Sequence, residues 1–149
     1  MKKFTFIILF LSVTLYGCEN YSVKGSGKAT ELNMEEIKAF MEEKKTGFLY
    51  VKSALEVDKE SDQMHLKNIK NVAKAEKVDF NVFDESELHA SEFSEQDISK
   101  LTVKQYSGTF AFYLDGAMIE EIDLGDLSKE EIPSELEKFV RNAKEIYLK

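Results

Sequence analysis

The sequence contains a single cysteine, Cys18, which lies near the N-terminus directly after Gly17. Disulfide exchange requires a thiolate that attacks a sulfur atom and passes through a mixed disulfide. Because residues 19–149 contain no other thiol, they cannot form a dithiol redox centre. Any chemistry in the main part of the chain must therefore come from carboxylates, lysines, histidines or hydroxyl groups.

The charged side chains that could best perform acid–base chemistry lie in the run Glu56-Val57-Asp58-Lys59. If this run leads into a helix, Glu56 and Lys59 lie near the helix N-terminus, where an anion is stabilised. A carboxylate beside a lysine can perform acid–base work when both groups are buried. We expect these residues to be solvated loop residues instead, and an acid–base pair remains the alternative.

The two histidines and an acidic stretch offer little support for a metal or cofactor site. His65 and His89 have no partner at metal-ligand or triad spacing, so we expect both at the surface. The acidic stretch could offer oxygen ligands to calcium, but its spacing fits no EF-hand loop and it lacks glycine. We expect a solvated acidic loop and no bound metal or cofactor. The stretch comprises Asp84, Glu85, Glu87, Glu92, Glu95 and Asp97.

The N-terminus has the pattern of a secretory signal, with Lys2 and Lys3 followed by an apolar run over residues 4–15. The apolar run is about half of the ~20 residues that a bilayer span requires, which disfavours a transmembrane helix. The ending Leu15-Tyr16-Gly17-Cys18 resembles the lipobox of bacterial lipoproteins, although Tyr16 departs from the usual residue there. The resemblance implies a signal peptide over residues 1–17, lipidation of Cys18, and an extracytoplasmic protein anchored to the cell membrane.

Residues 18–32 are expected to form the lipidated cysteine and a flexible tether, because Gly25-Ser26-Gly27-Lys28 has a linker composition. This run follows no predicted strand, so a phosphate-binding loop is not expected. The chain has 28 acidic and 20 basic side chains and a net charge of −8, which disfavours binding to nucleic acid. The remaining residues, 33–149, are expected to form one folded domain.

Hydrophobic periodicity predicts alternating helices and strands in this domain, followed by a hairpin at Asp115-Gly116 and a closing helix. Parallel strands joined by helices, then an antiparallel hairpin, predict an α/β fold with a central mixed sheet covered on both faces. Helices are predicted over 34–45 after a capping signal at Asn33 and Glu36, over 62–77, from about 94, and after a capping box at 128–131. Strands are predicted over 48–51, 78–83, 109–114 and 118–122.

This order of elements is similar to the thioredoxin fold, and three segments carry the resemblance. The first core strand of the family is similar to Phe48-Leu49-Tyr50-Val51. The strand and turn after the family's cis-proline are similar to Thr109 to Gly116. The last helix of the family is similar to Ser128 to Val140. The resemblance covers residues 33–147 and implies a three-layer thioredoxin-like fold. Within the family, the chain looks most like small extracytoplasmic proteins of Gram-positive bacteria, including bacteriocin transport accessory proteins.

The departures from that family fall on its redox features. The C-x-x-C pair falls on Glu56-Val57-Asp58-Lys59, and the cis-proline falls on Gly108. That proline shapes the groove in which family members hold an extended peptide. The corresponding segment here is Tyr106-Ser107-Gly108-Thr109, and glycine restores a backbone N–H that could pair with a peptide. The alternative is that Gly108 is simply a turn residue.

These features together predict a membrane-anchored accessory module of the cell envelope without thiol redox activity. Its partner is expected to be an unidentified envelope or secreted protein or peptide, bound at residues 53–61 and 106–109. Two alternatives remain open: an enzyme of another class that uses carboxylates near Glu56 and Asp58, and a structural spacer lipoprotein.

Overall fold

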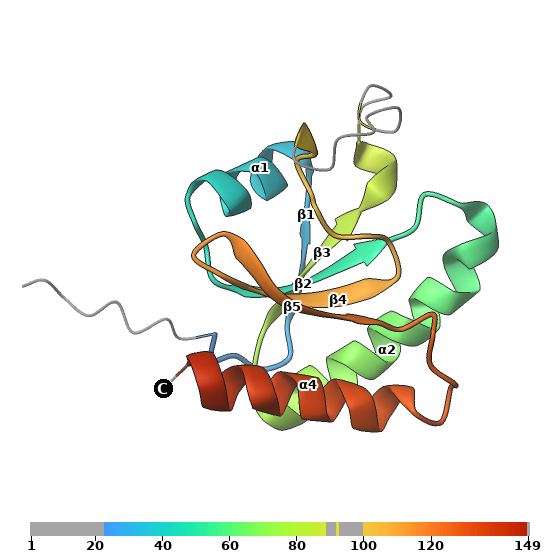
Figure 1. Cartoon of the computed structure of the whole chain (residues 1–149). Helices are drawn as coiled ribbons and strands as arrows, with labels where there is room; N and C mark the ends of the chain where they lie inside the picture. Colours follow the sequence, from blue (N-terminus) through green and yellow to red (C-terminus); the bar gives the residue numbers. More distant parts are fainter. Residues whose placement is uncertain (1–22, 89–91, 93–99, 149) are drawn as a thin grey trace, which may run out of the picture.

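A five-stranded mixed sheet forms the centre of the protein in the computed structural model, which describes residues 23–88, 92 and 100–148 (Figure 1). The strand order is β1-β3-β2-β4-β5, in which β1, β3 and β2 are parallel and β4 and β5 are antiparallel to their neighbours. The α/β class and the mixed sheet expected from the sequence are confirmed. The strands are β1 (Ala29–Leu32), β2 (Gly47–Lys52), β3 (Phe80–Asp84), β4 (Thr109–Leu114) and β5 (Ala117–Asp123).

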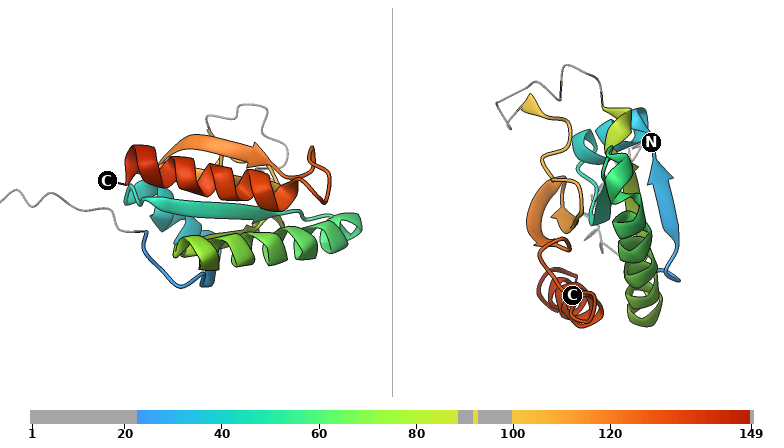
Figure 2. Two further views of the ribbon diagram at one scale, coloured as in Figure 1. Left: turned by 90° about the horizontal axis from the view of Figure 1, so that it is seen from below. Right: turned by 90° about the vertical axis from the view of Figure 1, so that its right-hand side faces the viewer.

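Helices cover both faces of this sheet. Helix α1 (Met34–Glu42) packs on one face, and α2 (Lys59–Glu76) and α4 (Ile132–Tyr147) lie beside each other on the opposite face (Figure 2). Because successive side chains of a strand point to opposite faces, each central strand contributes to both layers. In β2, Phe48 and Tyr50 face α2 and α4, whereas Leu49 and Val51 face α1.

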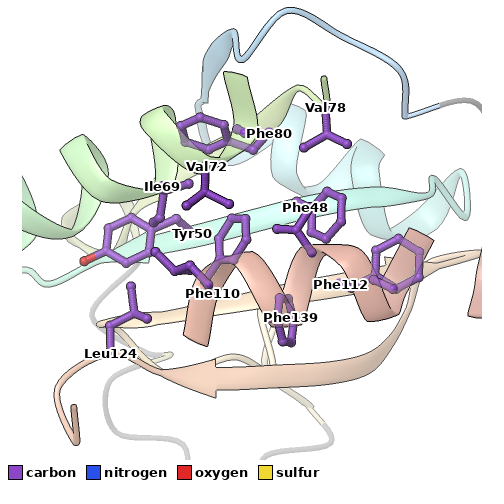
Figure 3. Close-up of a cluster of buried hydrophobic side chains, with 14 of the residues drawn as sticks. Phe48, Tyr50, Ile69, Val72, Val78, Phe80, Phe110, Phe112, Leu124 and Phe139 are labelled. Atoms are coloured by element: carbon purple, nitrogen blue, oxygen red, sulfur yellow. The ribbon is translucent and has the colours of Figure 1, made fainter. Parts of the chain in front are cut away.

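The larger of the two cores is rich in aromatic rings from the sheet and from α4 (Figure 3). The ring of Phe48 stacks on that of Phe110 with centroids 5.5 Å apart, and Phe139 of α4 lies against both. Burying each such side chain stabilises the fold by about 1.5–3 kcal/mol. This aromatic layer fixes the position of α4, and α2 packs beside it on the same face of the sheet.

Most of the predicted elements occur, with small shifts at their ends. Helix α1 starts at the capping box predicted for Asn33 and Glu36 but ends at Glu42, three residues early. Asp115 and Gly116 form the predicted hairpin turn, both with positive φ, which suits a tight two-residue connection. Ser128 and Glu131 bond to each other, yet α4 begins only at Ile132. The helix predicted from about residue 94 lies outside the described residues.

The expectation of a flexible tether over residues 18–32 is wrong for its described part, residues 23–32. Strand β1 pairs in parallel with β3 along the sheet edge, and Lys24 forms a bridge with Val78. One carboxylate oxygen of Asp79 accepts hydrogen bonds from the backbone N–H groups of Ser26 and Lys28, each at 2.8 Å. These two bonds hold the pKa of Asp79 below its usual value. Linker-like composition therefore does not make this segment flexible, because a distant carboxylate and a strand edge order it.

No helix among residues 23–88, 92 and 100–148 has the length and apolarity needed to cross a membrane.

Candidate functional site

A buried polar cluster lies where β2 ends and α2 begins. The Tyr50 hydroxyl is 2.6 Å from Asp62 Oδ1 and 2.9 Å from His65 Nδ1. Asp62 and His65 are only 7% and 5% exposed, so the expectation that His65 lies at the surface is wrong. The reason is helical spacing, because residues 62, 65, 69 and 72 share the face of α2 that packs on the sheet.

The hydrogen bonds of the cluster define the tautomer of His65. A carboxylate only accepts hydrogen bonds, so the single hydroxyl proton of Tyr50 is donated to Asp62. The Tyr50 oxygen then accepts from His65 Nδ1–H, which leaves Nε2 of the ring without a proton. His65 therefore presents a hydrogen-bond acceptor on the side of its ring away from Tyr50.

Burial determines the protonation states around this cluster. Burial, and then the hydrogen bond to Asp62, raises the pKa of Tyr50 far above its ordinary value, so the phenol keeps its proton. Burial lowers the pKa of His65, and the charges of Asp62 and Asp123 oppose this only in part, so the imidazole is neutral at neutral pH. The carboxylate of Asp62 is held by Tyr50, by the backbone N–H of Ser53 at 3.1 Å, and by the N-terminal end of α2.

A cavity of about 340 Å³ lies beside this cluster. The β2–α2 and β5–α4 connections, which contribute to its lining, are on the right-hand side of Figure 1. The structure thus brings together the two loops singled out in the sequence, residues 53–61 and 106–109. A third segment, residues 123–129 between β5 and α4, completes the wall and was not predicted. In Figure 3 the Tyr50 oxygen and Leu124 lie at this same end of the aromatic core. The lining residues are Ser53, Asp58, Ser61, Asp62, Met64, His65, Ser107, Gly108, Asp123, Leu124, Gly125, Leu127 and Lys129.

Gly108 is bonded inside the fold and cannot offer its backbone to a peptide. Its N–H donates to the carbonyl of Val51 at 2.8 Å, and its carbonyl accepts from the N–H of Leu124 at 3.2 Å. The expectation that its restored N–H pairs with a partner is therefore wrong. Its φ of +80° favours glycine and agrees with the alternative of a turn residue. The described residues contain no cis peptide bond.

The other residues of that predicted groove have different environments. Ser107 lines the cavity, and its backbone makes no hydrogen bond with the described part of the chain. Tyr106 is 65% exposed and faces a smaller neighbouring cavity of about 210 Å³. Thr109 is buried, and its hydroxyl donates to the carbonyl of Tyr106 at 2.8 Å. Of this segment, only Ser107 and Gly108 therefore line the 340 Å³ cavity.

The tetrad Glu56-Val57-Asp58-Lys59 is mostly exposed, as expected. Residues 56–58 form a short 3-10 helix that leads directly into α2. Glu56 and Lys59 form an ion pair of 2.6 Å whose side chains are both largely solvated. Asp58 differs, because it is half-buried at the cavity and accepts a 2.7 Å hydrogen bond from the Ser53 hydroxyl. Of the four residues, only Asp58 belongs to the cavity wall.

The remaining sequence candidates contribute no site among the described residues. Asp84 forms a 3.1 Å ion pair with Lys52 and caps the turn at Ser86. The described part of the chain contains no group of three His, Cys, Asp or Glu side chains placed to hold a metal ion. Cys18, His89, Glu95 and Asp97 lie outside the described residues.

Comparison with known proteins does not identify the chain, since no protein-family model and no curated protein matches it. Function must therefore be inferred from the geometry of the cavity. Its wall combines carboxylates with a neutral imidazole acceptor, and it contains no thiol. Asp62 was not singled out from the sequence, and His65 was expected at the surface, although both continue the helical stripe of Ile69 and Val72. That continuation of an apolar stripe by polar residues was the signal that could have identified them.

Proposed function

We propose that this protein is a membrane-anchored, thioredoxin-like module without thiol redox chemistry, which binds a protein or peptide partner in the cell envelope. The order of parallel strands, antiparallel hairpin and closing helix supports the thioredoxin-like assignment. The basic and apolar N-terminus ending in Gly17-Cys18 supports the lipid anchor, which two acyl chains would make stable.

The observation that carries the binding function is the position of exposed apolar side chains. Five large hydrophobic residues of the described chain are exposed. Three of them, Leu55, Val57 and Tyr106, lie on the two loops that border the cavity. Val57 is 83% exposed, although it lies only two residues before α2, a helix with a buried face. Apolar side chains gathered around a concave polar site are typical of a surface that a partner covers.

The alternative of an enzyme based on Glu56 and Lys59 has less support. Acid–base work by such a pair depends on burial, and both side chains are largely solvated. The alternative of a featureless spacer is disfavoured by the cavity and by the apolar side chains around it. We therefore retain partner binding as the function.

Site-specific photocrosslinking in cells tests this proposal. A photoreactive phenylalanine analogue replaces Val57, Tyr106 or, as a control, Ile146. Ile146 is an exposed apolar residue of α4 and is matched in exposure (58%) to Tyr106. We expect the same crosslinked protein from positions 57 and 106, because both loops border one site, and no such product from position 146.

Two outcomes would contradict the proposal. Crosslinks to the same protein from all three positions would indicate unspecific collision. Absence of any product from positions 57 and 106, with the variants present at normal levels in the membrane fraction, would show that these loops do not meet a partner.

A further inference from the structure

The imidazole of His65, in the wall of the 340 Å³ cavity, has an acceptor atom without a partner among the described residues. Its Nδ1 bonds to Tyr50, whereas Nε2 makes no hydrogen bond to the described residues. Nε2 is accessible to solvent, since it is not one of the fully buried polar atoms that lack a hydrogen-bond partner. Because His65 is only 5% exposed and lines this cavity, the cavity is the route by which a donor can reach the free acceptor. Leaving such an acceptor unpaired is costly, so a donor from water or a ligand is expected.

The charges around this acceptor are mainly negative. The cavity wall contains Asp58, Asp62 and Asp123 but only one lysine, Lys129. Asp62 uses both of its oxygens for hydrogen bonds inside the cluster. One oxygen of Asp58 accepts a hydrogen bond from the Ser53 hydroxyl. One oxygen of Asp123 accepts a hydrogen bond from the Gly125 N–H. The second oxygen of each makes no hydrogen bond within the described residues, so two carboxylate acceptors and one imidazole acceptor remain available.

We propose that this cavity binds the cationic end of a lysine or arginine side chain from the partner, through His65 Nε2, Asp58 and Asp123. An ammonium group has three donors and no acceptor, and a guanidinium group has five donors, so both match an all-acceptor wall. The aliphatic stem and flanking residues of the partner would pack on Leu55 and Val57 at the rim. This inference rests on the proposed binding function and specifies the chemistry of the side chain that is recognised.

Other occupants fit the cavity less well. An anionic side chain would meet three carboxylates. An apolar side chain would remove water from the free oxygens of Asp58 and Asp123 without replacing its hydrogen bonds. A metal ion fits less well, because His65, Asp58 and Asp123 do not form a group that could hold a metal ion at the short distances of metal–ligand bonds. The hydrogen bonds of an ammonium or guanidinium group are longer, about 2.9 Å between nitrogen and oxygen. A cationic side chain is the occupant that satisfies both the charge and the acceptors.

Binding of short synthetic peptides to the full-length protein in detergent tests the inference. The peptides are acetylated, amidated and labelled with a neutral dye, and they share apolar flanks around a central lysine, arginine, glutamine or glutamate. We expect the lysine and arginine peptides to bind about tenfold more tightly than the glutamine peptide, and the glutamate peptide to bind least. Added salt should weaken binding of the lysine peptide, because charge attraction is screened.

Isosteric variants locate the effect at the cavity. The Asp58→Asn/Asp123→Asn double variant should lose about tenfold in affinity for the lysine peptide and little for the glutamine peptide. Asparagine can still accept the bonds from Ser53 and Gly125, so the fold should be kept. Asp126→Asn is the matched control, because Asp126 is exposed in the same loop but does not line the cavity. It should bind like the unchanged protein.

Several results would overturn the inference. Equal affinity for the lysine and glutamine peptides would do so without any variant. Binding of free putrescine as tightly as the lysine peptide would show that the cavity takes a free polyamine and not a side chain of the partner. If crosslinks at Val57 and Tyr106 still capture a partner, either result refutes recognition of the partner's cationic side chain and leaves the binding function intact. Absence of both crosslinks and peptide binding would refute both.

Discussion

The hydroxyl of Tyr50 donates a 2.6 Å hydrogen bond to Asp62, which joins the core-facing side of β2 to the first turn of α2. The Asp62 carboxylate is buried, and its partners are the hydroxyl, one backbone N–H and the helix N-terminus. His65 bonds to the same hydroxyl from the next turn of the helix. One phenol therefore organises the inner wall of the cavity and fixes the side of His65 that faces it.

Removing this hydroxyl should destabilise the protein. Tyr50→Phe keeps the ring but leaves Asp62 and His65 each short of one buried hydrogen-bond partner. The expected loss is about 1–3 kcal/mol in the free energy of unfolding, measured by urea denaturation. Tyr106→Phe is the control, because Tyr106 is exposed and its hydroxyl makes no hydrogen bond to the described residues. A Tyr50→Phe protein as stable as this control would show that the hydroxyl contributes little.

The stability of the protein should fall between neutral and mildly acidic pH because of His65. Burial lowers the pKa of His65 in the folded state, whereas the unfolded chain has the ordinary value of about 6.5. The unfolded state therefore binds the proton first as the pH falls. The contribution of His65 is complete above about pH 6.5 and is lost toward its lower folded pKa.

Two measurements check this pH dependence. The ring pKa of His65, followed by NMR, should lie below about 6.5. Urea denaturation between about pH 7.5 and pH 5.5 should show a steeper loss of stability for the unchanged protein than for His65→Gln. A ring pKa at or above the ordinary value would contradict the burial of a neutral imidazole.

Two of the residues 56–59, Glu56 and Lys59, should contribute almost nothing to the stability of the fold, whereas Asp58 should contribute measurably. Replacing both Glu56 and Lys59 by alanine should change the free energy of unfolding by less than about 0.5 kcal/mol, because the pair is exposed. Asp58→Ala should cost about 1 kcal/mol, because it removes the acceptor of the Ser53 hydroxyl. Thermal and urea unfolding measure both effects. A larger loss for the exposed pair than for Asp58 would reverse this assignment.

Gly27 should be intolerant of substitution if residues 23–32 are part of the fold. Its φ is +83°, and an added Cβ would lie 2.7 Å from the Lys74 backbone. Gly27→Ala should therefore destabilise the protein by about 1–3 kcal/mol in a thermal or urea unfolding experiment. Glu130→Ala, at an exposed position, is the comparison and should have a small effect. If Gly27→Ala is as stable as the unchanged protein, residues 23–32 behave as a flexible tether and not as part of the fold.

Cys18→Ala should abolish lipid attachment and membrane retention. The prediction depends on the signal-like N-terminus and on the position of this cysteine directly after Gly17. Metabolic labelling with a fatty acid, together with fractionation of cells, measures both effects. We expect label and membrane association for the unchanged chain, and an unlabelled precursor or released protein for the variant. Normal labelling of the variant would remove the basis for the lipoprotein assignment.

The sequence by itself determined those features that depend on composition and on neighbouring residues. The 3.6-residue periodicity located α1 and α2, the two-residue alternation located β3 and β5, and short apolar runs located β2 and β4. Asp115-Gly116 located the β4–β5 hairpin. The capping box at Asn33 fixed the start of α1. Each of these elements depends on residues within about one helical turn or one strand. Absence of a thiol from residues 19–149 excludes dithiol chemistry whatever the fold, because no arrangement of the chain can supply the missing sulfur atoms.

Only the tertiary structure decided which polar residues are buried and which loops meet. Residues 26–28 are ordered by Asp79, about fifty positions away, and Gly108 is bonded to Val51 and Leu124. Tyr50, Asp62 and His65 come together because a strand and the following helix pack face to face. Such contacts join residues far apart in sequence, and local patterns contain no information on their partners. The charge and shape of the cavity arise from these long-range contacts, which form only when the sheet and its helices are assembled.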